Sequence, residues 1–145
     1  MKLFRRATFA AAWLLLAATA AAKIGTMTST ALVMSVQDPV LGLRVSTVLV
    51  LATGIEVLTC VGLIVLRDAY LRGLVLAGLG VQFLIYHAAK VVIAPHGPCP
   101  CLGSSWKWLG LTELGATRLA LGIALTITAA GVLLLAHRGG PSEAA

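Results

Sequence analysis

The chain has 145 residues, of which 59% are hydrophobic and 11% are charged. An ordinary soluble domain has about 45–50% apolar and about 25% charged residues, so this composition excludes a soluble domain of useful size and predicts that lipid surrounds much of the chain. The net charge is +6, but the Lys and Arg residues lie mostly at the ends of apolar runs, which argues against a nucleic-acid partner. The sequence has no nucleotide-binding, metalloprotease or nucleophile-elbow motif.

Four apolar runs are each long enough to cross a bilayer as a helix of about 20 residues. They predict an all-α membrane protein, a four-helix transmembrane bundle that forms one domain over residues 1–138. The expected spans are about 7–23, 44–66, 73–94 and 116–136, and residues 139–145 are expected to be a disordered tail.

The first apolar run follows a basic start and has two interpretations. A basic start, an apolar core and three consecutive alanines over 20–22 describe a cleavable signal peptide. The same residues also describe a first spanning helix with Lys23 at its outer end. Trp13 falls in the middle of the run and is expected to pack against a neighbouring helix.

Residues 24–43 mix polar and apolar side chains. They predict a short interfacial helix that ends near Asp38-Pro39, because a residue before proline disfavours the helical conformation. An ordered loop that caps the bundle is the alternative. A tight charged turn is expected over 67–72, between the second and third spans.

The second span carries one charged residue, Glu56, about halfway along. A carboxyl group near the bilayer centre is expensive, so Glu56 should face the bundle interior and be protonated or paired with His87 or Lys90 on the next helix. It serves either as a polar clasp between helices or as a proton relay or contact for a quinone. Cys60, one turn after Glu56, is expected to be a buried packing residue.

The residues of the third span predict a close contact with a neighbouring helix and one polar edge. Its glycines, at positions 73, 78 and 80, should allow a neighbouring helix to approach closely. Lys90 should snorkel from the outer end of the span, and His87 should be a hydrogen-bonded core residue. Gln82 and Tyr86 are expected to pack and to pair helices.

Reactive side chains cluster in the segment after the third span, where Pro100 alone separates Cys99 from Cys101. Two thiols this close can form a short, strained disulfide, or can bind one soft metal ion together. We favour a redox pair, because strained disulfides are the exchangeable ones. A static disulfide that stiffens the loop and a metal site formed by His96, Cys99 and Cys101 are the alternatives.

Basic residues near the ends of the spans indicate the orientation. The basic start of the chain and the short 67–72 turn favour the cytoplasmic side for both termini. The segment that contains Cys99 and Cys101 then faces the periplasm, an oxidising compartment in which protein disulfides form.

The chain resembles the MauE-type methylamine utilisation proteins, within the wider DoxX-like group of four-span membrane proteins. The resemblance covers residues 7 to 136 approximately and lies in Lys23 closing the first span, Glu56 inside the second, and Cys99-Pro-Cys101-Leu-Gly103 after the third. The family form of the last motif is usually written Cys-Gly-Cys-Phe-Gly, so proline and leucine occupy the variable places here.

This family is associated with maturation of methylamine dehydrogenase, whose small subunit is rich in disulfides, alongside a thioredoxin-like partner. The resemblance implies a redox role in forming or transferring disulfides and implies that the first hydrophobic segment is retained. It does not imply that methylamine is the substrate.

Together these features predict a multi-pass protein of the bacterial inner membrane that exchanges disulfides through Cys99 and Cys101. The expected partner is a periplasmic thioredoxin-like protein or a disulfide-bearing substrate. The supporting residues are His96, Glu56, His87 and Lys90. No cofactor is assigned, and a quinone stays an open alternative. The alternative function is a metal-binding or scaffold membrane protein with a structural Cys-x-Cys loop.

Overall fold

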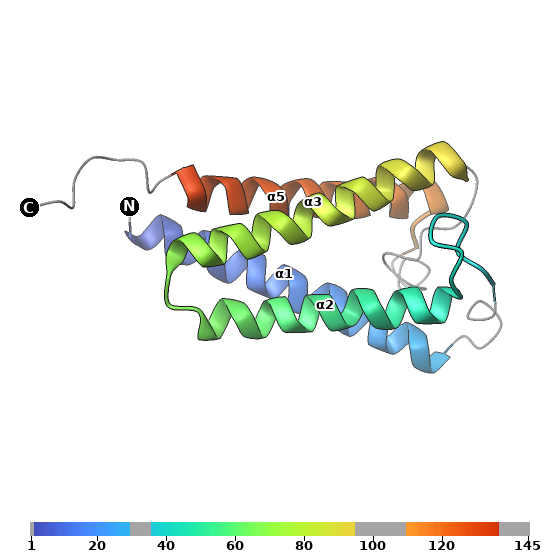
Figure 1. Ribbon diagram of the computed structural model, residues 1–145, viewed down its shortest axis with the longest axis horizontal. Helices are drawn as coiled ribbons and strands as arrows, with labels where there is room; N and C mark the ends of the chain where they lie inside the picture. The colour runs from blue at the N-terminus through green and yellow to red at the C-terminus, as the bar shows by residue number, and fades with distance from the viewer. Residues whose placement is uncertain (1, 30–35, 95–109, 137–145) are drawn as a thin grey trace, which may run out of the picture.

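Four long helices form the bundle in this computed structural model (Figure 1). The structure describes residues 2–29, 36–94 and 110–136. The helices are α1 (Lys2–Ser29), α2 (Val45–Val65), α3 (Ala69–Ile93) and α5 (Glu113–Ala136). Each contains an apolar stretch long enough to cross a membrane, which confirms the predicted all-α, four-span fold class.

Consecutive helices run in opposite directions along the bundle (Figure 1). The start of α1, the connection between α2 and α3, and the end of α5 therefore lie together at one end. The turn over residues 36–44, the end of α3 and the start of α5 lie at the other end. The residues of the candidate site described below lie between the middle of the bundle and this second end.

The core consists of aliphatic side chains from every helix. Its most deeply buried members are Leu16, Leu63, Leu76 and Ile127. Trp13 and Cys60 are partly buried against this cluster, which confirms the packing roles expected for both.

The outer faces of the helices are apolar. Leu58 on α2 and Val92 on α3 keep 72% and 82% of their surface exposed. Exposed aliphatic side chains on every helix are what a bundle surrounded by lipid requires, because water would not tolerate so large an apolar surface.

The closest helix pairing, between α3 and α5, depends on small residues. A Cβ atom added at Gly80 would lie 2.7 Å from the backbone nitrogen of Thr128, and one added at Gly73 would lie 3.2 Å from the carbonyl oxygen of Gly131. Gly78 has no atom within 4 Å of such a Cβ. The predicted close approach is therefore confirmed at Gly73 and Gly80 and is wrong at Gly78.

The connection between α2 and α3 is shorter than the sequence predicted. Asp68 caps α3, because its carboxylate accepts a hydrogen bond of 2.9 Å from the backbone N–H of Tyr70. Arg72, one turn into α3, donates from Nε to the carbonyl oxygen of Leu66. Residues 69–72, expected to lie in the turn, therefore form the first turn of the helix.

The segment after α1 also differs from the prediction. Helix α1 continues six residues past Lys23 to Ser29, so residues 24–29 extend the first span and do not begin a separate interfacial helix. Residues 36–44 form a hairpin-like turn in which Val45 donates to the carbonyl of Val36 at 2.9 Å. Gly42 has a φ of 66° in this turn, a conformation that favours glycine. The expected tail at 139–145 lies outside the described residues.

We expect Gly80→Ala to destabilise the bundle by about 1–3 kcal/mol, because the added methyl group meets the backbone of α5. Gly78→Ala is the matched control on the same helix, where the new methyl group has open space and should be neutral or slightly stabilising. Unfolding of the purified protein in detergent micelles measures both. Equal losses from the two variants would contradict the α3–α5 packing.

Candidate functional site

An ion pair between Lys23 of α1 and Glu56 of α2 lies inside the bundle. The Lys23 Nζ ammonium donates a hydrogen bond to Oε1 of Glu56. The two residues keep only 2% and 1% of their surface exposed. Breaking such a pair leaves an uncompensated buried charge, which costs about 3–5 kcal/mol in proteins, so each residue fixes the position of the other.

The predicted partner of Glu56 was wrong, although its interior position was right. Glu56 was expected to be protonated or to pair with His87 or Lys90 of α3, and it pairs with Lys23 of α1. Because α1 continues to Ser29, Lys23 lies well inside the helix and not at its outer end. Its side chain is therefore directed into the bundle, at the depth of Glu56.

Aromatic and polar groups surround this ion pair. The Nζ atom of Lys23 lies 5.2 Å from the centre of the Phe83 ring of α3, within the range of a cation–π contact. A small cavity of about 30 Å³ adjoins the pair, lined by Thr19, His87 and small side chains of α5. Oε2 of Glu56 has no hydrogen-bond partner within the described part of the chain. The cavity is large enough for one water molecule, which could hydrogen-bond to this oxygen.

His87 and Lys90 lie one turn apart on α3, and both are buried. His87 lines the small cavity beside Glu56, so the structure brings these two predicted supporting residues together. The expectation that Lys90 snorkels to the membrane surface is wrong, since only 5% of it is exposed. Among residues 2–29, 36–94 and 110–136, Nζ of Lys90 has no hydrogen-bond partner.

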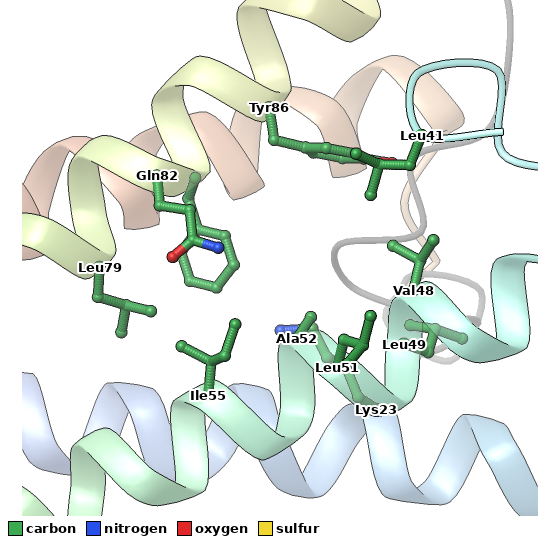
Figure 2. A pocket seen from close by; sticks show the side chains of 11 residues that line it. Lys23, Leu41, Val48, Leu49, Leu51, Ala52, Ile55, Leu79, Gln82 and Tyr86 are labelled. Carbon is green, nitrogen blue, oxygen red and sulfur yellow. The ribbon is translucent and has the colours of Figure 1, made fainter. Parts of the chain in front are cut away.

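A larger cavity of about 200 Å³ lies between α2 and α3 (Figure 2). These two helices pack less extensively against each other than α1 does with α2 or α3 does with α5. The lining is mostly aliphatic, with three hydrogen-bonding side chains from Lys23, Gln82 and Tyr86. Because Lys23 borders both cavities, the larger space reaches directly to the ion pair.

A buried carboxylate attaches the 36–44 turn to the bundle beside this cavity. Asp38 is 1% exposed and accepts hydrogen bonds from the backbone N–H groups of Val40 and Leu41 at 3.0 and 2.9 Å. It also accepts one from the hydroxyl of Tyr86 on α3. These bonds hold Leu41 at the cavity wall.

This arrangement was not predicted from the sequence. Asp38-Pro39 was expected to end a short helix, and Tyr86 was expected to pack and to pair helices. Asp38, Pro39 and Gly42 together are typical of a turn, and that composition was the signal available. Their contact with Tyr86 could not be inferred, because the two segments are 48 positions apart.

The predicted redox and metal residues His96, Cys99 and Cys101 lie outside the described residues. The residues on either side of this segment are described. Ala94 follows α3 and Gly110 precedes α5, and both are at the end of the bundle that carries the 36–44 turn (Figure 1).

Comparison of the chain with protein-family models, with curated proteins and with solved structures found no match. The site is therefore interpreted from its own geometry.

We expect Lys23→Met and Glu56→Leu each to lower the free energy of unfolding by about 3–5 kcal/mol, because each leaves one charge buried and unpaired. The double variant should recover most of that loss, since it leaves neither charge. A double-mutant cycle in detergent micelles measures the coupling between the two residues. Losses that simply add would show that the two side chains do not interact.

Proposed function

We propose that this protein is a membrane thiol–disulfide carrier that passes reducing equivalents between Cys99 and Cys101 and an extracytoplasmic thiol protein. The observation that carries the proposal is the Cys99-Pro100-Cys101 sequence between two closely packed, membrane-spanning helices, α3 and α5. The resemblance to MauE-type proteins supports the same role, with a thioredoxin-like protein or a disulfide-bearing substrate as the partner.

The exchange needs no reactant beyond the two proteins. The thiolate of one cysteine attacks a sulfur of the partner's disulfide, forming a mixed disulfide and releasing one partner thiolate. The second cysteine, as its thiolate, then attacks the mixed disulfide at the first cysteine's sulfur. Cys99 and Cys101 end oxidised as a disulfide, and the partner ends reduced as a dithiol. The reverse sequence oxidises the partner.

A basic residue next to the cysteine pair supports this chemistry. A positive charge near a thiol favours the thiolate form, which is the reacting species. His96 would supply that charge from the sequence position three residues before Cys99. The ion pair between Lys23 and Glu56 fixes α1 against α2 near the middle of the bundle.

The proposal places the protein in a bacterial inner membrane with both termini in the cytoplasm. Four spans put both ends of the chain on one side, and Arg67 and Arg72 lie at that end of the bundle, next to the connection between α2 and α3. Basic residues in short loops favour the cytoplasmic side. The cysteine pair would then face the periplasm, where its protein partners are.

Thiol trapping in membranes tests the carrier function. We expect Cys99 and Cys101 to change between dithiol and disulfide when reductant is replaced by oxidant. A Cys101→Ser variant should accumulate a mixed disulfide between Cys99 and its partner, because the resolving thiol has been removed. Cys60→Ser is the control and should leave the exchange unchanged, since Cys60 packs against the core of the bundle.

Two outcomes would reject the carrier function. A cysteine pair that keeps one redox state under both conditions would indicate a structural disulfide. Protection of the thiols by bound metal, lost in a His96→Ala variant, would indicate the alternative metal site formed by His96, Cys99 and Cys101.

A further inference from the structure

We propose that the cavity between α2 and α3 binds the ring of a neutral, lipid-soluble molecule that carries ring oxygens, which is the chemistry of a membrane quinone. The binding site stands on the geometry of the described residues. Its role as an electron acceptor rests on the function proposed above.

The size and position of the cavity indicate a ligand that arrives through the bilayer. A cavity of about 150 Å³ holds a benzene molecule in an engineered protein, so about 200 Å³ accommodates a substituted six-membered ring. Leu51 lines the cavity and is 52% exposed on the lipid side of the bundle. The cavity therefore borders the hydrocarbon region, and an apolar molecule can reach it without crossing the packed core.

One polar side chain in the lining lacks a partner. Gln82 is exposed, makes no hydrogen bond to any residue that the structure describes, and projects from α3 into the space facing α2 (Figure 2). An amide without a hydrogen-bond partner is costly in hydrocarbon. A carbonyl or hydroxyl oxygen on a bound ring would accept a hydrogen bond from the Gln82 amide and remove that cost.

The charges around the cavity favour a neutral ligand over an anion. The ammonium of Lys23 is already paired with Glu56, and the hydroxyl of Tyr86 already donates to Asp38. An anionic ligand would find no unpaired cation in the lining and would approach the carboxylate of Glu56. The rings of Phe83 and Tyr86 belong to the lining and offer aromatic surface to a planar ligand.

The stoichiometry of this ligand class matches the proposed function. Two thiols that become one disulfide release two electrons and two protons. Reduction of one quinone ring to its quinol consumes two electrons and two protons, one at each ring oxygen. A quinone would therefore reoxidise a reduced Cys99–Cys101 pair completely, with no further oxidant.

Photo-crosslinking of the full-length protein in detergent micelles tests the site, with a photoreactive azido-benzoquinone that carries a decyl chain as the probe. We expect labelled peptides from the region Leu79–Tyr86 of α3, and competition by unlabelled decyl-benzoquinone gives the Kd. Gln82→Leu keeps the size of the side chain and should weaken binding about three- to tenfold, the effect of one lost hydrogen bond.

A second pair of variants tests the cavity itself. Ala52→Phe places a ring in the cavity and should abolish labelling, whereas Leu58→Phe adds a ring on the lipid-facing side of the same helix and should not change it. If Ala52→Phe does not fold, the affinity of the Gln82→Leu variant still tests the binding site. Unchanged affinity in Gln82→Leu would indicate an acyl-chain site without recognition of ring oxygens, and labels outside the cavity lining would indicate partition into the micelle. Either result would overturn the proposal.

The same measurement in a Cys99→Ser/Cys101→Ser variant separates this proposal from the proposed function. Binding should be unchanged, because the contacts proposed for the ring come from Gln82, Phe83 and Tyr86 of α3. Quinone binding without thiol exchange would support the binding site and reject the carrier function. Thiol exchange without quinone binding would support the carrier function and reject the binding site.

Discussion

A carboxylate and an ammonium buried in an apolar bundle are stable only in contact, and the arrangement of this molecule depends on that constraint at Lys23 and Glu56. The pair joins α1 to α2 inside the bundle. It also fixes which face of each helix is turned inward, because rotating either helix would expose one charge to hydrocarbon. The polar interior of the bundle is built around this contact.

Helix α3 contributes residues to the surroundings of the ion pair and to the cavity, and it leads into the cysteine segment. Phe83 and His87 lie beside the pair, Lys90 lies one turn farther toward the cysteine segment, and Gln82 faces the cavity on the side of α2. The close packing of α3 on α5 through Gly73 and Gly80 holds this helix rigidly on one side. The looser contact with α2 on the other side leaves room for a ligand.

The sequence predicted the four spans and the close helix approach at Gly73 and Gly80, but not which polar side chains pair between the helices. Apolar runs long enough for a bilayer predicted four spans, and the cost of a carboxyl group in lipid predicted that Glu56 faces inward. Hydropathy places a residue at a depth but does not say which neighbouring helix it faces, so the partner of Glu56 was missed. Lys23 was misplaced because the helix continues beyond the apolar run. The cavity depends on how α2 and α3 diverge, which no local pattern encodes, and the cysteine pair stays a prediction.

The contact between Lys23 and Glu56 can be measured directly by solid-state NMR in lipid bilayers, with ¹⁵N at the lysine ζ positions and ¹³C at the glutamate δ positions. The chain has four lysines and three glutamates, so a dipolar coupling that disappears in Glu56→Gln and in Lys23→Met is assigned without ambiguity. We expect a strong coupling, because the two groups are within hydrogen-bond distance. A spectrum with no such coupling would contradict the buried ion pair and the arrangement derived from it.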